Sequence, residues 1–113
     1  MEELMWAAVQ NKHNPNYKIE YEAVLRCLEY WKQNDFMESG NMAKIFEHLY
    51  LKPEHFKDTQ IKLSLQLGVS DRTLLRYRKK FVQLFAYNLE ELRRAYRRSA
   101  VERSMPDIVL RKI

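Results

Sequence analysis

The sequence predicts an all-α protein, a compact domain of four to six helices. Only two glycines and three prolines occur among 113 residues. These are too few turn-forming residues for the many tight connections of a β-sandwich or barrel. Apolar residues recur along most of the chain at intervals of three and four, which is the spacing of one helix face. With 46% hydrophobic residues, the chain has enough apolar surface to bury a core.

Three helices separated by polar breaks are predicted for the first half of the chain. Residues 2–10 form the first helix, and the polar residues 11–16 form the loop after it. An amphipathic helix follows from Lys18 to about Gln33. A third helix starts after the polar stretch 34–41 and stops before Pro53, which opens a short turn. The apolar residues expected in the core are Leu4, Met5, Ala8, Val9, Tyr21, Val24, Leu25, Leu28, Trp31, Met42, Ile45, Phe46 and Leu49.

The segment at 61–69 allows two interpretations. Its apolar residues alternate with polar ones, which is the period of a half-buried strand. The segment also follows two residues that can cap a helix, Asp58 and Thr59, and Gly68 suits the turn after a helix. No partner strand is predicted elsewhere, so a strand would leave its backbone groups unpaired. A helix is therefore expected. The alternating residues are Ile61, Leu63, Leu65, Leu67 and Val69.

A long helix is predicted to begin at Asp71, after the capping residue Ser70. Two alternatives remain for its course. Asn88 and Glu91 resemble a new capping box, which would divide it into two helices. The apolar stripe continues past Asn88 without interruption, which indicates one helix to about Glu102. The apolar face of this region comprises Leu74, Tyr77, Phe81, Leu84, Phe85, Leu89, Leu92 and Tyr96.

These elements predict one folded unit with short additions at its ends. Residues 1–16 form the N-terminal helix and loop, and residues 17–103 form a single helical domain whose last part, 88–103, is a basic helix. Pro106 ends any helix that reaches it. Residues 104–113 are expected to be a tail.

The net charge of +5 is concentrated in one part of the chain. Residues 1–70 carry 8 Lys and Arg against 10 Asp and Glu, whereas residues 71–103 carry 10 against 4. A basic helix attracts phosphate, but a solvated surface helix has the same composition, so charge alone leaves both interpretations open. The same two alternatives, contact with a nucleic-acid backbone or plain solvation, apply to the four arginines Arg93, Arg94, Arg97 and Arg98.

Between Gln60 and Lys79 the chain reads QIKLSLQLGVSDRTLLRYRK, which resembles a helix-turn-helix DNA-binding unit spanning residues 60–80. In that motif a small residue lets the two helices approach, and a glycine turns the chain between them. Ser64, in place of the usual alanine, and Gly68 stand at these positions. The residues that would hold both helices to one core are Leu63, Leu67, Val69, Leu74 and Tyr77, the last being larger than the common aliphatic residue.

The run from Val69 to Arg76 is most similar to helix-turn-helix units of the sigma factor region-four type, including small phage transcription regulators of the ArpU kind. The similarity rests on the Gly-Val-Ser and Thr-Leu spacing and on the basic residues that follow. Residues 1–55 carry no marker of a family. The resemblance implies a DNA-binding protein of transcription, with RNA polymerase or another transcription or phage protein as a candidate partner.

The residues of the second helix of this motif predict a DNA-binding surface. A recognition helix presents its N-terminal residues to base edges in the major groove. Arg72 and Arg76 suit bidentate contacts to guanine, and Leu75 suits a thymine methyl. Asp71 has three candidate roles, which are stabilising the helix end, pairing with a neighbouring arginine, and discriminating bases through the cytosine amino group. The remaining predicted contacts are to phosphate, from Ser70, Thr73, Arg78, Lys79 and Lys80.

Sequence-specific binding of double-stranded DNA, in transcriptional regulation, is therefore the expected function. A single unit makes few base contacts, so a homodimer is expected, through the stripe Phe85, Leu89, Leu92 and Tyr96 or with that stripe folded onto its own core instead. Two alternatives are a phage DNA-packaging or recombination subunit that uses the same motif, and a helical protein-interaction adaptor or anti-regulator without DNA binding.

Other function classes lack their sequence features. No histidines or cysteine stand at the short spacings of zinc sites, and no phosphate loop, serine nucleophile motif or paired-carboxylate cluster occurs, so no enzyme, cofactor or metal is expected. No window holds the roughly 18 apolar residues of a membrane span. The single cysteine, Cys27, has no internal disulfide partner, which favours a cytoplasmic protein and a structural thiol. Core packing is expected for Trp6, Trp31, Phe46, Tyr50 and Phe56.

Overall fold

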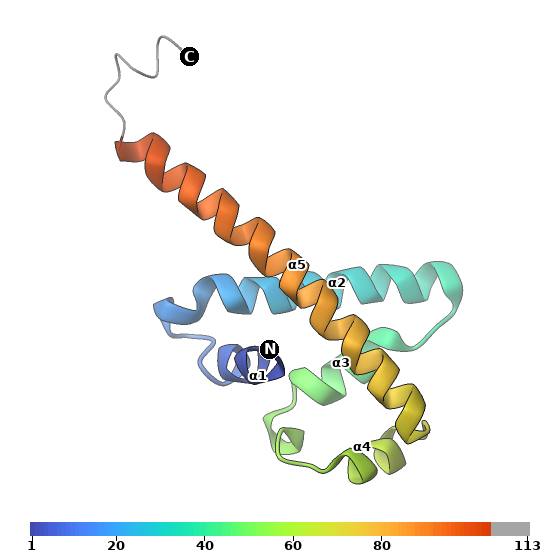
Figure 1. Cartoon of the computed structure of the whole chain (residues 1–113). Coiled ribbons are helices and arrows are strands. Elements are labelled where there is room, and N and C mark those ends of the chain that lie inside the picture. The colour runs from blue at the N-terminus through green and yellow to red at the C-terminus, as the bar shows by residue number, and fades with distance from the viewer. Residues whose placement is uncertain (105–113) are drawn as a thin grey trace.

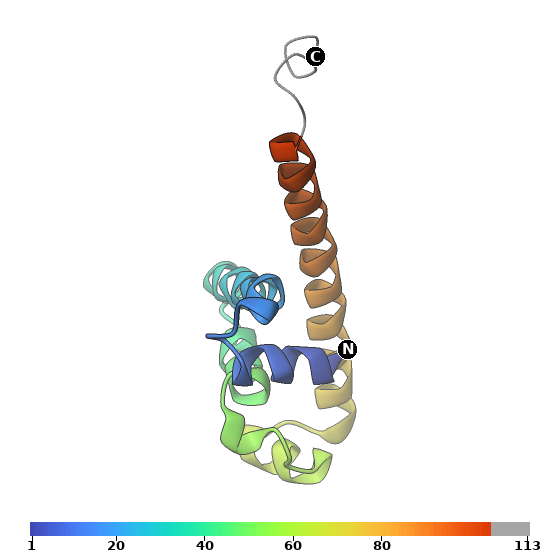
Figure 2. The ribbon, with the colours of Figure 1, turned by 90° about the vertical axis from the view of Figure 1, so that its left-hand side faces the viewer.

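The computed structural model describes residues 1–104 and is all-α, as predicted, without a strand in this range. Its five α-helices are α1 (Glu2–Gln10), α2 (Lys18–Glu38), α3 (Met42–Tyr50), α4 (Gln60–Leu67) and α5 (Asp71–Ser104). Two short 3₁₀ turns, Pro15–Tyr17 and Pro53–His55, precede α2 and follow α3. The predicted tail lies outside the described residues beyond Ser104. Figures 1 and 2 show that α5 crosses α2, and that its C-terminal part extends away from the other helices.

An aromatic cluster forms the centre of the core. Phe81 of α5 lies edge-on to three rings, with centroid distances of 5.4 Å to Trp31, 5.3 Å to Phe46 and 5.9 Å to Tyr50. Phe46, Tyr50 and Phe81 are fully buried. Trp6 packs against Tyr50 and donates its indole N–H to the carbonyl oxygen of Leu49, 3.0 Å away. Rings from α1, α2, α3 and α5 thus meet in one core, as predicted for these aromatic residues.

Helix α2 is longer than predicted. It continues through the polar residues after Gln33 to Glu38, and the chain turns at Ser39, whose φ is 54°, and Gly40. The carboxylate of Asp35 accepts hydrogen bonds from the backbone N–H groups of Met42 and Ala43, both at 2.8 Å. The first part of the polar stretch therefore belongs to α2, and Asp35 within it caps the start of α3. Leu25, expected in the core, is 41% exposed, because α2 is covered on the side of Val24, Cys27 and Trp31.

The segment with alternating apolar residues is a helix, as expected. The hydroxyl of Thr59 accepts a hydrogen bond from the backbone N–H of Lys62 at 3.2 Å, and α4 ends at Gly68 in the left-handed conformation. Only Leu63 of the alternating residues is fully buried, whereas Ile61 and Leu65 are exposed. In a helix, residues two apart do not share a face, so the alternation has no structural counterpart here.

Helix α5 is a single helix without a break at Asn88. The side chain of Asn88 does not cap a new helix but donates to the sulfur of Cys27, 3.3 Å away on α2. The stripe proposed as a dimer interface is already used within the chain: Phe85, Leu89 and Leu92 are buried in the common core, and α2 packs against α5. Of the four stripe residues only Tyr96, which is 36% exposed, lies outside the buried core. Of the two alternatives for this stripe, folding onto the chain's own core is therefore the one observed in the structure.

Candidate nucleic-acid interface

The turn between α4 and α5 has the backbone conformation that its sequence suggests. Gly68 adopts φ +69°, a left-handed conformation that glycine occupies without steric cost. The backbone N–H of Val69 donates to the carbonyl of Ser64 at 3.2 Å, and the hydroxyl of Ser64 donates to the carbonyl of Val69. Leu63 and Leu74, one on each helix, are both buried in the core. Ser64 therefore closes the turn through both its side chain and its carbonyl.

The start of α5 is capped by the hydroxyl group of Ser70. The hydroxyl of Ser70 accepts a hydrogen bond from the backbone N–H of Thr73 at 3.1 Å and donates to the Thr73 hydroxyl at 2.9 Å. Asp71 lies in the first turn, where a carboxylate complements the positive end of the helix dipole. It forms no ion pair with Arg72 or Arg76 in the described structure. Of the three roles considered for Asp71, the arginine pairing is therefore not observed.

The outer face of the first three turns of α5 is basic and uncovered. Arg72, Arg76, Lys79 and Lys80 are all exposed, as are Ser70 and Asp71, while Thr73 is half-buried. Within residues 1–104 none of these four cations pairs with a carboxylate. Arg76 makes one long hydrogen bond, of 3.4 Å, to the Thr73 hydroxyl. Leu75, which is 52% exposed, adds an apolar side chain to this basic face.

Arg78 differs from its neighbours. Its side chain is only 19% exposed, and its guanidinium donates two hydrogen bonds to the carboxylate of Glu2 on α1, through Nε at 2.8 Å and Nη2 at 2.7 Å. A third bond goes from Nη1 to the side-chain oxygen of Gln60. The hydrogen bonds and charge of Glu2 raise the pKa of Arg78. Arg78 is therefore committed to contacts within the protein, whereas the side chains of the other eight predicted contact residues take no part in these bonds.

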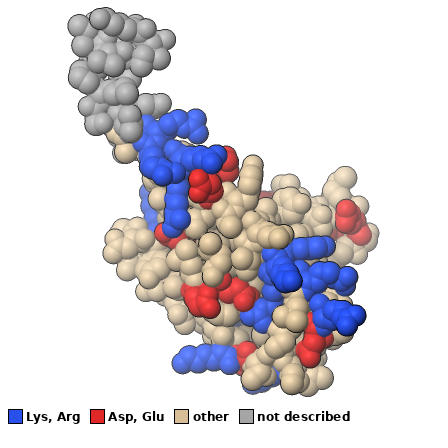
Figure 3. Space-filling model, in the orientation of Figure 1, with Lys and Arg blue, Asp and Glu red and all other residues tan. Residues whose placement is uncertain are grey.

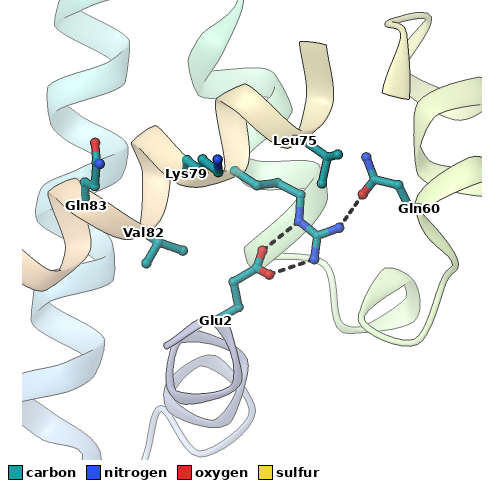
Figure 4. A pocket seen from close by; sticks show the side chains of 7 residues that line it. Glu2, Gln60, Leu75, Lys79, Val82 and Gln83 are labelled. Carbon is teal, nitrogen blue, oxygen red and sulfur yellow. Dashed lines mark hydrogen bonds and ion pairs between the residues drawn. The ribbon is translucent and has the colours of Figure 1, made fainter. Parts of the chain in front are cut away.

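Figure 4 shows how this network joins three helices beside a shallow pocket. Glu2 also accepts a hydrogen bond of 2.6 Å from the Tyr50 hydroxyl. The Tyr50 pKa is raised by burial and by the neighbouring Glu2 carboxylate. Gln60, at the start of α4, donates in turn to the carbonyl of Asp71, 3.3 Å away at the start of α5. The network links α1 to both helices of the proposed motif, and sequence reasoning missed it because Glu2 and Arg78 are 76 positions apart.

The basic side chains gather in two places on the face seen in Figure 3, one over the N-terminal half of α5 and one along its extended C-terminal part. In the second group, Arg93 pairs with Glu20 at 3.6 Å, and Arg94 pairs with Glu90 at 3.2 Å. Arg97 and Arg98 are exposed and form no ion pair with a described residue.

Two histidines that are separate in sequence lie together. The rings of His48 and His55 stack with centroids 4.0 Å apart, and His55 pairs with Asp58 at 2.8 Å. The hydrogen bond from His55 lowers the pKa of Asp58. No group of three or more histidine, cysteine or acidic residues suited to a metal ion occurs in the described part of the chain. Burial raises the pKa of the Cys27 thiol to about 11, which leaves it protonated at neutral pH.

Comparison with protein-family models, curated proteins and solved structures finds no match to this chain. Among residues 1–104, no helix combines the length and the apolar character that crossing a membrane requires.

Proposed function

We propose that this protein binds double-stranded DNA in a sequence-specific manner and acts in transcriptional regulation. In this proposal α4 and α5 form a helix-turn-helix, and the N-terminal turns of α5 enter the major groove. The observation that carries the proposal is the outer face of α5, where Arg72, Arg76, Lys79 and Lys80 are exposed and have no carboxylate partner among the described residues.

The distribution of charge supports a polyanionic partner. Elsewhere in the described chain some cations are paired, such as Arg26 with Glu22 and Lys62 with Asp58. Others, such as Lys12 and Lys32, are exposed singly, whereas on the outer face of α5 four cations lie within three turns of one helix. On the outer face of α5 the cations lack such partners, so their field extends into solvent and attracts phosphate. The mixture on this face also suits base readout, since guanidinium groups bind guanine and an exposed leucine contacts a thymine methyl.

The packing around the N-terminal part of α5 supports a recognition helix that is held rigidly. The inner face of this part of α5 is held by Leu74 and Phe81 in the core, while Arg78 is fixed by Glu2. Contacts held by packed side chains keep the outward residues in a constant orientation, which direct readout of base edges requires. We infer that Ser70 and Thr73 place the helix end at a phosphate, where backbone N–H groups and hydroxyls are good donors.

Fluorescence anisotropy with a labelled mixed-sequence duplex tests this proposal. Wild-type protein should bind with a Kd of roughly 1–100 μM near physiological salt, and the affinity should fall steeply as salt increases. The double variant Arg76→Ala, Lys79→Ala should lose most of this binding. A matched control, Lys12→Ala, Lys32→Ala, removes two exposed charges from outside α5 and should keep it. Absence of binding at low salt, or equal loss in both variants, would reject the proposal and favour an acidic protein partner.

A further inference from the structure

Two pairs of cations stand on the same outer face of α5, far apart along it. Lys79 and Lys80 form the proximal pair, and Arg97 and Arg98 form the distal pair. Each distal residue follows its proximal counterpart by 18 positions. Because 18 residues make about five full turns of an α-helix, the two pairs point in the same direction, about 27 Å apart along the axis.

The structure leaves this face open from one pair to the other. Gln83, Tyr87 and Glu90 occupy the same face between the pairs and are all exposed. The opposite face of the helix is buried, with Phe81, Phe85, Leu89 and Leu92 in the core. The direction in which the two pairs point is therefore set by the packing of one continuous helix, and no other described element covers it.

The distal pair lies where the helix has left the body of the protein. Beyond Leu92 no residue of α5 through Ala100 is buried, and Figures 1 and 2 show this part extending past the other helices. Like charges four positions apart, as in Arg93 and Arg97 or Arg94 and Arg98, destabilise an isolated helix. Arg93 and Arg94 have carboxylate partners, whereas Arg97 and Arg98 form no ion pair with any of residues 1–100, so the repulsion between like charges falls on this pair. A polyanion bound on this face would relieve it.

We infer that α5 binds duplex DNA with both pairs, the distal pair holding the phosphate backbone outside the base-reading site. This inference rests on the proposed function and extends it. Arg97 and Arg98 lie 21 to 26 residues beyond Arg72 and Arg76, which is about 32–39 Å along the axis of α5. One turn of duplex rises by about 34 Å, so the distal pair reaches backbone about one turn from the bases read by Arg72 and Arg76. The binding site is consequently longer than a helix-turn-helix alone would contact.

The salt dependence of binding separates this inference from the proposed function. Each cation that neutralises a phosphate contributes about 0.9 to the slope of log K against log salt concentration. On a mixed-sequence duplex of about three turns, the variant Arg97→Gln, Arg98→Gln should therefore reduce the slope by roughly 2 and weaken binding several-fold. Arg97→Lys, Arg98→Lys keeps both charges and should keep the slope. The variant Lys12→Gln, Lys32→Gln controls for net charge and should also keep it.

Several outcomes would overturn the inference. If the distal glutamine variant keeps the wild-type slope while Arg76→Ala, Lys79→Ala loses binding, the distal pair does not contact DNA and the proposed function still stands. If the wild type fails to bind duplex DNA at low salt, both the inference and the proposed function are wrong. An effect of the distal variant confined to single-stranded RNA would also contradict it. Circular dichroism and thermal unfolding of each variant verify that the slope reports contacts and not loss of α5.

Discussion

At the scale of single residues, cations that are neighbours in the sequence of α5 have different roles. Arg76, Arg78 and Lys79 lie within one turn, yet Arg78 is only 19% exposed and bound by Glu2, whereas the other two are exposed. Successive residues point about 100° apart around a helix, so Arg78 turns toward α1 while its neighbours turn outward. The Glu2 carboxylate serves both Arg78 and Tyr50, so it satisfies two polar groups that burial would otherwise penalise.

Replacement of Glu2 by glutamine should therefore destabilise the fold. The charge-assisted bonds to Arg78 would be lost and a half-buried guanidinium left without its counter-charge, so the free energy of unfolding should decrease by about 1–3 kcal/mol. Denaturant unfolding measures this. Glu3→Gln is the matched control, because Glu3 is exposed and contacts only the N-terminal amine, and it should change stability by less than about 0.5 kcal/mol. Equal effects of the two substitutions would refute a structural role for the Glu2–Arg78 pair.

At the scale of elements, the α4–α5 connection depends on one backbone conformation. Gly68 has φ +69°, and a Cβ added there would meet no atom within 4 Å. The cost of a side chain at this position is thus conformational and not steric crowding by neighbours. The same left-handed conformation lets Val69 and Ser64 form their two hydrogen bonds, which set the angle at which α5 leaves α4.

Gly68→Val should lower the free energy of unfolding by about 1–2 kcal/mol, because a β-branched residue is strained at positive φ. Gly68→Asn should have a much smaller effect, since asparagine tolerates this conformation. Thermal or denaturant unfolding of the wild type and the two variants gives the order of their stabilities. If valine and asparagine prove equally stable, the left-handed turn does not constrain this connection.

At the scale of the whole molecule, α5 has two separate roles on two faces. One face supplies Leu74, Phe81, Phe85, Leu89 and Leu92 to the core, and the other displays cations to solvent. Since the outward residues contribute little to packing, folding and partner binding can be altered independently. Substitutions on the outer face should consequently change DNA affinity without measurable change in stability.

Arg76 and Lys80 should differ in what they contribute to DNA binding. Arg76→Ala should weaken binding to a selected site by about 1–3 kcal/mol and broaden the choice of base at one position. Lys80→Ala should weaken all duplexes alike and reduce the salt slope by about 1. Competition binding with selected and scrambled duplexes distinguishes the two patterns. Identical behaviour of both variants on every duplex would show that neither residue reads bases.

Most of the helical architecture is predictable from the sequence. The spacing of apolar residues locates the helices, and the capping and glycine signals near Thr59, Gly68 and Ser70 match the observed α4 and the start of α5. The exposed residues at the start of α5 are predictable for the same reason, since periodicity determines which side of a helix is apolar. The polar stretch after Gln33 is ambiguous, because the same residues continue α2 and cap α3.

The sequence by itself determined that this chain is helical, that its basic charge lies after residue 70, and which face of α5 is apolar. Tertiary structure alone decided what covers each face: α2 packs against α5, Phe85, Leu89 and Leu92 are buried in the common core, and Glu2 binds Arg78. It also decided between one helix and two at Asn88: α5 continues unbroken, and the Asn88 side chain donates to the sulfur of Cys27 on α2. Periodicity depends on neighbours along the chain, whereas these outcomes depend on packing between segments far apart in sequence.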